Sequence, residues 1–151
     1  MAIAQYQRRL SWATQANLPM IREIVPTPVV LVVDDEALIR WSLSEGLTES
    51  GYAVRLAATA AEARSVLDAF GYEPLVVVLD LRLPDMADLT LLKEIRAKRP
   101  DVPVIMMTAH GSAEDASQAR ALGVSRFVGK PFDVGEMVRM VGNAWRQRAE
   151  A

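Results

Sequence analysis

The chain has 151 residues, 51% hydrophobic and 24% charged, which is the composition of a globular domain large enough to bury a core. Its 17 basic and 19 acidic residues give a net charge of −2, so a broad basic surface for nucleic acid as the main partner is not expected. The sequence has no cysteine, so disulfides and thiolate metal sites are excluded. It also has no apolar run long enough to cross a bilayer and no apolar block of a signal peptide. We therefore expect a soluble cytoplasmic protein without a membrane partner.

Strand and helix signals alternate along the chain after residue 28. Apolar runs rich in β-branched residues predict five strands, at Val29–Val33, Ala53–Leu56, Leu75–Leu79, Val102–Met107 and Val124–Val128. Apolar residues at helical spacing, followed by glycine or proline stop signals, predict helices at about 37–50, 59–70, 89–99, 112–122 and from 133 onwards. The second of these helices begins with Thr59–Glu62, which fits a capping box. Short connections between alternating strands and helices predict an α/β domain with a doubly wound parallel sheet.

The two ends of the chain lie outside this predicted sheet. Residues 1–28 carry only a weak helical pattern of apolar residues and close with Pro26 and Pro28, so we interpret them as an N-terminal extension or linker. Residues 29–148 then make one domain of ordinary size, and residues 149–151 make a short tail.

Acidic side chains follow two of the predicted strands. Asp34 and Asp35 come directly after the first strand, and Asp80 comes directly after the third. The carboxyl ends of neighbouring parallel strands meet at one edge of the sheet, where α/β proteins bind ligands. Carboxylates held that close repel one another, so the arrangement predicts a cation between them.

Two further polar residues stand at the ends of two other strands, Thr108 after the fourth and Lys130 after the fifth. The other two lysines, Lys93 and Lys98, lie on a predicted helix whose solvated face explains them, whereas the ammonium of Lys130 suits a phosphate oxygen or a carboxylate. Each of these residues also has a structural interpretation by itself, as a helix cap, a turn former or a strand former. Those interpretations do not explain why acids, hydroxyl and lysine converge on one edge of the sheet.

This combination of residues resembles a bacterial two-component response-regulator receiver domain. The matching motifs are Asp34-Asp35, Asp80 with Pro84 four residues later, Thr108-Ala109 and Lys130-Pro131, and the resemblance covers residues 29 to about 148. It implies a flavodoxin-like α/β fold, in which five helices cover a five-stranded parallel sheet in the order 2-1-3-4-5. The family also suggests a cis peptide bond between Lys130 and Pro131.

The resemblance implies a phosphorylation site with Mg²⁺ as its cofactor. Asp80 would be the phosphoacceptor, attacking a phosphoryl group carried on a kinase histidine. The magnesium ion would be bound by the carboxylates of Asp35 and Asp80, by the backbone carbonyl of Arg82 and, through water, by Asp34. Oxygen ligands with several retained waters are the coordination that magnesium prefers.

The resemblance also implies a conformational switch. Lys130 would pair with a phosphoryl oxygen, and Thr108 would hydrogen-bond the phosphoryl group and draw its own loop inward. Phe127 stands at the family's switch-aromatic position and would turn inward as space opens beside Thr108. One added phosphate would thus bias an element that has two states.

A phosphorylation-activated signalling switch of a two-component phosphorelay is therefore the leading hypothesis. The donor would be a histidine kinase or a histidine phosphotransfer protein, and the signal would pass to a downstream protein target by direct contact. Dimerisation through the face of the fourth helix, fifth strand and fifth helix would be another route of output, without direct contact with nucleic acid. Such a domain catalyses only its own phosphoryl transfer and slow autodephosphorylation, so we do not expect an enzyme.

Several alternatives stay open. The receiver fragment of a longer transcriptional regulator would have the same sequence features. A phosphorylation-independent docking module is suggested by Ala87 and Asp88, which replace the family's usual acid and glycine, and Asp88 either adopts a strained turn or caps the third helix. A haloacid-dehalogenase-like phosphatase is disfavoured because Arg82 occupies the place of its general acid. A nucleotide-binding module is disfavoured because acids, instead of a glycine-rich turn, follow the first strand.

Overall fold

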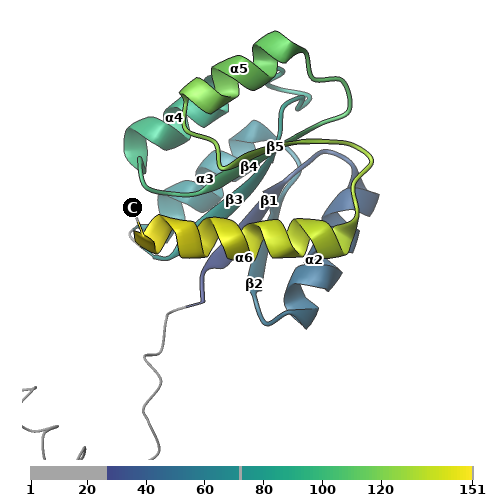
Figure 1. The fold of residues 1–151 in the computed structure, drawn as a ribbon, viewed down its shortest axis with the longest axis vertical. Helices are drawn as coiled ribbons and strands as arrows, with labels where there is room; N and C mark the ends of the chain where they lie inside the picture. The colour runs from purple at the N-terminus through teal and green to yellow at the C-terminus, as the bar shows by residue number, and fades with distance from the viewer. Residues whose placement is uncertain (1–26, 72, 151) are drawn as a thin grey trace, which may run out of the picture.

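The computed structural model describes residues 27–71 and 73–150, so the predicted N-terminal extension lies almost wholly outside the described residues (Figure 1). Five parallel strands form one sheet in the order β2-β1-β3-β4-β5. Their bounds are β1 (Val29–Val33), β2 (Ala53–Ala57), β3 (Leu75–Asp80), β4 (Val104–Thr108) and β5 (Arg126–Gly129). The doubly wound sheet and the strand order expected from the sequence are confirmed.

Helices cover both faces of this sheet (Figure 1). On one face lie α2 (Ala37–Glu49) and α6 (Val134–Glu150), and on the other lie α3 (Ala60–Phe70), α4 (Thr90–Lys98) and α5 (Ala113–Ala121). Within the described part of the chain, none of these helices combines the length and the apolar character that crossing a membrane requires.

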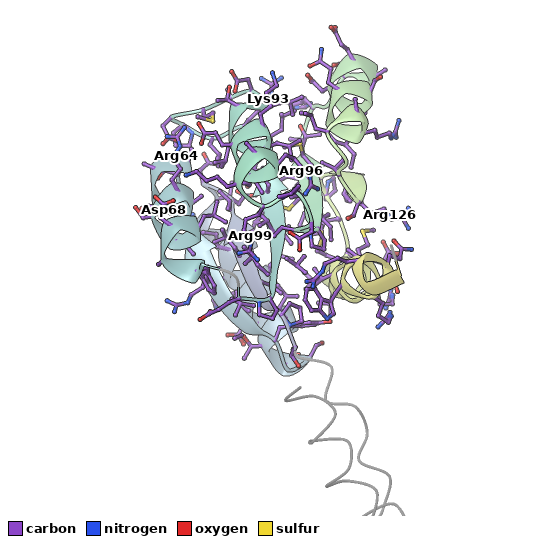
Figure 2. The ribbon with its side chains drawn as sticks, turned by 90° about the vertical axis from the view of Figure 1, so that its left-hand side faces the viewer. Arg64, Asp68, Lys93, Arg96, Arg99 and Arg126 are labelled. Carbon is purple, nitrogen blue, oxygen red and sulfur yellow. The ribbon has the colours of Figure 1, made fainter. Side chains whose placement is uncertain are left out.

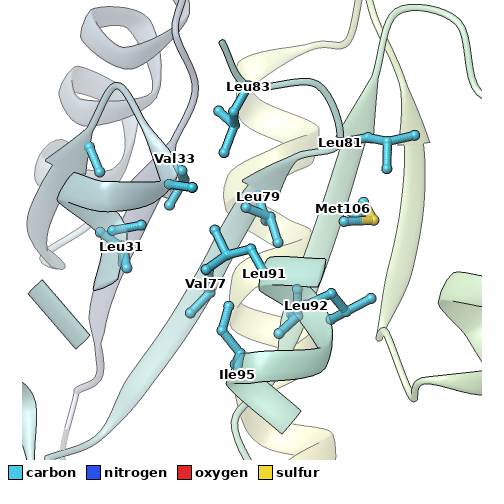
Figure 3. Packing of buried hydrophobic residues seen from close by; sticks show 14 of the residues in the cluster. Leu31, Val33, Val77, Leu79, Leu81, Leu83, Leu91, Leu92, Ile95 and Met106 are labelled. Carbon is cyan, nitrogen blue, oxygen red and sulfur yellow. The ribbon is translucent and has the colours of Figure 1, made fainter. Parts of the chain in front are cut away.

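Alternate side chains of the central strands build two separate cores. The core beneath α3 and α4 includes Leu31, Val33, Val77, Leu79, Leu91, Leu92 and Ile95 (Figure 3). The core beneath α2 and α6 includes Val30, Val32, Val76, Val78, Leu43, Leu47 and Met137. Each of these side chains is at most 2% exposed. Because both faces of β1 and β3 are covered, the two strands are unbroken apolar runs and their polar residues are confined to the ends.

Two strands begin later than the sequence predicts. β4 begins at Val104 instead of Val102, because the Val102 amide closes a turn onto the end of α4. β5 begins at Arg126 instead of Val124, because the Val124 amide still bonds to a carbonyl of α5. At the C-terminal end, α6 continues to Glu150, past the predicted domain end at residue 148.

The predicted capping box at the start of α3 forms only in part. The Thr59 hydroxyl accepts a hydrogen bond from the Glu62 amide at 3.1 Å, but the Glu62 carboxylate accepts from the Ala58 amide at 2.7 Å instead of from Thr59. A complete capping box occurs at the start of α5, between Ser112 and Asp115. The first two amides of α3 therefore depend on a partner from elsewhere in the chain.

The helices α2 and α6 approach each other closely at Gly46. A Cβ built on Gly46 would lie 2.6 Å from Val134 Cγ1 and 3.5 Å from Val138 Cγ2. We expect Gly46→Ala to lower the free energy of unfolding by about 1 kcal/mol, because this overlap outweighs the helix propensity that alanine adds. Urea unfolding measures the change. Additive effects in a double-mutant cycle with Val134→Ala, which removes the overlapping methyl group, would contradict the explanation.

The C-terminal end of α5 is held by one side chain of α4. The Arg96 guanidinium donates hydrogen bonds to the carbonyls of Leu122 at 2.7 Å and Gly123 at 2.8 Å, directly after α5, and also to the carbonyl of Val102 before β4 (Figure 2). Ala119 is the buried residue of α5, so the helix offers only a small apolar face to the core. The attachment of α5 therefore relies on the hydrogen bonds at its C-terminal end.

Candidate functional site

The acidic residues predicted from the sequence meet at the carboxyl edge of the sheet. Val33 of β1 pairs with Leu79 of β3, so the next residues along each strand, Asp34 and Asp80, are neighbours. Oxygens of Asp34, Asp35 and Asp80 lie within 4.8 Å of one another. Asp34 is fully buried and Asp80 is 6% exposed, whereas the Asp35 side chain faces solvent. Three carboxylates thus share one crevice, and two of them have little access to water.

Lys130 supplies the ammonium among these acids. Its Nζ lies 2.7 Å from Asp34 Oδ2, 3.2 Å from Asp80 Oδ2 and 3.2 Å from Glu36 Oε1, and its side chain is 9% exposed. The backbone holds Lys130 beside the end of β4, because its amide donates to the Thr108 carbonyl at 2.8 Å. The peptide bond from Lys130 to Pro131 is cis, as the family suggests. Burial lowers the pKa of Lys130, but the charges of Asp34 and Asp80 outweigh it and leave the pKa raised.

The Asp80 carboxyl group has a raised pKa. Burial is the main cause, and repulsion from Asp34 adds to it. The Arg82 amide, which donates to Asp80 Oδ1 at 3.2 Å, and the ammonium of Lys130 act in the opposite direction. Burial therefore outweighs the stabilisation that the Arg82 amide and the Lys130 ammonium give to the ionised carboxylate.

The crevice fits a hard divalent cation. Asp34 Oδ2 is a buried oxygen whose close partner among the described residues is the Lys130 ammonium, 2.7 Å away in an ion pair. Together with the oxygens of Asp35 and Asp80, this leaves an all-oxygen set of donors that carries excess negative charge. Such donor sets suit Mg²⁺ or Ca²⁺ rather than softer metals.

Thr108 ends β4, and Phe127 lies on the neighbouring β5, where it pairs with Met106. Thr108 is 3% exposed, and its hydroxyl accepts a hydrogen bond from the His110 amide at 3.2 Å. Phe127 is half-buried and packs against the core beneath α4. A Cβ on Gly111 would lie 2.5 Å from Thr108 Cγ2 and 2.7 Å from Phe127 Cε1, so this loop passes directly over both side chains. Gly111 is required for the close approach, and the sequence analysis did not single it out.

Two further residues of the site were missed. Glu36 pairs with Lys130, and its amide donates to Asp34 Oδ1 at 2.8 Å. Arg40, one turn into α2, donates to the Asp34 carbonyl at 2.8 Å. The acidic run after β1 already contained Glu36, but its contact with Lys130 joins residues that lie 94 positions apart in the chain. The apolar spacing of this helix did not predict that the Arg40 side chain would contact the loop after β1.

The unusual loop after β3 leads into α4 through a hydrogen bond accepted by Asp88. Asp88 Oδ1 accepts a hydrogen bond from the Thr90 amide at 2.8 Å, and hydrogen bonding with Thr90 lowers the pKa of Asp88. The N-cap residue of α4 is Leu89, whose side chain makes no cap hydrogen bond, so Asp88 satisfies the first amide of the helix from the position before the cap and is not itself the predicted N-cap. Arg82 and His110, which flank the crevice, are both exposed.

A family comparison agrees with this geometry. The model of the response regulator receiver domain matches residues 30–142. The chain belongs to this family. Among curated proteins, the receiver domain is 40% identical to the DNA-binding transcriptional regulator NtrC of Klebsiella pneumoniae over 118 residues, which are 77% of this chain and 24% of NtrC. It is 37% identical to the transcriptional regulatory protein GlrR of Escherichia coli K12 over 126 residues, 83% of this chain and 28% of GlrR. The receiver domain therefore spans about a quarter of the length of these relatives.

Solved structures of receiver domains are also similar to this chain. The CheY-like receiver domain protein from Methanospirillum hungatei JF-1 superposes with a TM-score of 0.75 at 27% identity, covering 83% of this chain and 98% of that one. The beryllofluoride-activated NtrC4 receiver domain, solved in solution as a dimer, gives a TM-score of 0.73 at 37% identity, covering 79% of this chain and 97% of that one. The receiver domain is thus similar to its relatives in both fold and sequence.

Proposed function

We propose that this receiver domain is a cytoplasmic, phosphorylation-activated switch of a two-component phosphorelay, with Asp80 as the phosphoacceptor. The observation that supports it best is the ammonium of Lys130, 2.7 Å from Asp34 Oδ2 and 3.2 Å from Asp80 Oδ2 at the carboxyl edge of the sheet. This ammonium is in place to pair with an oxygen of a phosphoryl group on Asp80, while the excess of carboxylates suits a divalent cation.

In the proposed reaction, a carboxylate oxygen of Asp80 attacks the phosphorus of a phosphohistidine. A P–O bond forms, the P–N bond breaks, and the imidazole nitrogen keeps the electron pair and takes up a proton. Lys130 favours the ionised form of Asp80 that this attack needs, against the burial that raises its pKa. When bound by Asp35, Asp80, the backbone carbonyl of Arg82 and, through water, Asp34, Mg²⁺ supplies positive charge to the phosphoryl oxygens. The domain catalyses its own phosphoryl transfer and autodephosphorylation only.

The donor in this proposal is a histidine kinase or a histidine phosphotransfer protein. An apolar groove of about 180 Å³ opens beside Lys130, between α2 and the connection from β5 to α6, and includes Ile39 and Phe132 in its lining. Leu38, which also lines the groove, is 72% exposed, and Trp41, three residues further along α2, is 61% exposed, which is high for large apolar side chains. A helix of the donor lying over this groove would cover apolar surface and bring its phosphohistidine toward Asp80.

The response to phosphorylation is proposed to pass through Thr108 and Phe127. Thr108 would exchange its hydrogen bond to the His110 amide for one to the phosphoryl group, and Phe127 would move into the space left beside Gly111. Because α5 offers little apolar surface and is held at its C-terminal end, its N-terminal end is the part free to follow. The face of α5, β5 and α6 would then bind a downstream protein or a second copy. In a second form of this proposal, the receiver domain controls an output domain elsewhere in a longer regulator, as its similarity to DNA-binding relatives suggests.

Incubation with acetyl phosphate and Mg²⁺, followed by intact-mass measurement, tests the function. We expect one phosphoryl group per chain, and none when the metal is removed with EDTA, because both the metal and Lys130 are needed to balance phosphoryl charge. Phosphoramidate is a second donor that resembles phosphohistidine in its P–N bond. No adduct with either donor in the presence of Mg²⁺ would favour the phosphorylation-independent docking module.

A further inference from the structure

The loop between β3 and α4 is attached to α3 through one carboxylate. Leu83 and Met86 bond to each other through both backbone amides, at 3.0 and 3.2 Å, which closes a tight turn with Asp85 at its tip. From there Asp85 Oδ1 accepts from the Ala60 amide at 2.8 Å, and Oδ2 accepts from the Ala61 amide at 3.0 Å. The side chain thus links residues that lie 24 and 25 positions apart in the chain.

These two hydrogen bonds complete the start of α3. Thr59 accepts from the third amide of the helix, and Asp85 accepts from the first and second. Both carboxylate oxygens are engaged, so the orientation of the turn relative to α3 is fixed as well as its distance. The negative charge also lies at the positive end of the helix, and the pKa of Asp85 is accordingly lowered, first by the hydrogen bond from Ala60.

The clamped turn belongs to the loop that begins at the proposed phosphoacceptor. Leu81 and Leu83 are 3% and 5% exposed, and the Leu81 amide donates to the Met107 carbonyl at 2.9 Å, so the loop is anchored at its start and its middle. Arg82, whose carbonyl is the proposed metal ligand, lies between these two anchors, directly before the turn. A loop with three fixed points holds that carbonyl in one place, whereas loss of the third would let the segment shift.

We propose that Asp85 is a positioning residue for the metal and phosphorylation site. By binding the first two amides of α3, it holds the turn 83–86 against the helix and limits movement of the neighbouring Arg82 carbonyl, the proposed metal ligand. Asp85 does not touch the metal or the phosphoryl group. The inference rests on the proposed function, because it concerns the same site.

The test compares Asp85→Ala with Asp88→Ala, a matched variant in the same loop. Asp88 also accepts a hydrogen bond from a helix amide, but only from Thr90, two residues away, so its loss does not free the loop. Mg²⁺ affinity, followed by calorimetric titration, should fall about tenfold in Asp85→Ala, as for other residues that orient metal ligands. It should be unchanged in Asp88→Ala. Asp85→Asn, whose carbonyl oxygen retains one acceptor, should lie between wild type and Asp85→Ala and serves if the alanine variant does not fold.

Outcomes of this titration separate the positioning role from the proposed function. Equal Mg²⁺ affinity in wild type, Asp85→Ala and Asp85→Asn would overturn the positioning role, even if the wild type is phosphorylated. Weaker Mg²⁺ binding in Asp85→Ala, in a protein that accepts no phosphoryl group from any donor, would support the positioning role and overturn the function. Absence of Mg²⁺ binding to the wild type would overturn both. A purely structural role would lower the melting temperature and leave the Mg²⁺ midpoint unmoved.

Discussion

Asp80→Asn should abolish the phosphoryl adduct completely and, at the same time, stabilise the metal-free protein. The amide cannot act as the nucleophile, so acetyl phosphate with Mg²⁺ should leave the mass unchanged. Stability should rise because the substitution removes a buried negative charge that Asp34 repels, while Lys130 keeps Asp34 and Glu36 as partners. We expect the free energy of unfolding to rise by about 1 kcal/mol at pH 7 in EDTA, the usual size of a single-residue effect, which corresponds to a rise of about 3 °C in Tm.

The pH dependence of this stability difference gives an independent check. The pKa of Asp80 is raised in the folded state, so the ionised carboxylate weakens the fold, and wild-type stability falls as pH rises from the unfolded pKa of about 4 through the folded value. The gap between Asp80→Asn and wild type should therefore be largest at neutral pH and close as pH falls toward 4. Subtracting the wild-type stability from that of Asp80→Asn at each pH removes the contributions of Asp85 and Asp88, whose pKa values are lowered and which both proteins share. An Asp80→Asn protein that is less stable than wild type in EDTA at pH 7 would contradict the electrostatic account.

The sheet and the convergence of its polar residues were predictable because both depend on short-range patterns. Unbroken apolar runs predict buried parallel strands, and parallel strands bring their carboxyl ends to one edge regardless of side-chain detail. Asp34, Asp80 and Lys130 therefore meet as expected. Their roles in phosphoryl transfer stay predictions until the variants are measured.

The features that sequence reasoning missed depend on contacts between distant segments. Asp85 stands in a turn where any acid would look solvated, and only the tertiary fold brings it to the open amides of α3. Arg96 occupies a polar position of α4, yet its guanidinium turns toward the carbonyls after α5. The starts of β4 and β5 were predicted too early for a related reason. Val102 and Val124 have strand propensity, but their amides donate to carbonyls at the ends of the preceding helices.

Lys130→Ala should destabilise the metal-free protein by about 3 kcal/mol, because it leaves buried carboxylates without a cation. Asp34 is fully buried and would retain no basic partner closer than its backbone contact with Arg40. Mg²⁺ should restore most of the loss, and its affinity should be at least as high as in wild type, because lysine no longer competes for the same oxygens. Thermal unfolding in EDTA and across a Mg²⁺ titration measures both effects. Lys98→Ala is the control, since that lysine and its partner Asp68 are each 65% exposed and the variant should change stability by no more than about 0.5 kcal/mol.

The same variant separates phosphorylation from its conformational consequence. Asp80 and the metal ligands remain in Lys130→Ala, so an adduct should still form with acetyl phosphate and Mg²⁺, although more slowly. Without the ammonium, the phosphoryl group loses its contact with the residue that follows β5, and Thr108 and Phe127 should keep their unphosphorylated positions. Hydrogen exchange of α5 and β5 should therefore change on phosphorylation of the wild type and stay unchanged in Lys130→Ala. If hydrogen exchange of α5 and β5 changes as much in the phosphorylated variant as in the wild type, Lys130 does not transmit the phosphorylation signal. If Mg²⁺ does not restore the stability of the variant, Lys130 does not act by neutralising the two acids.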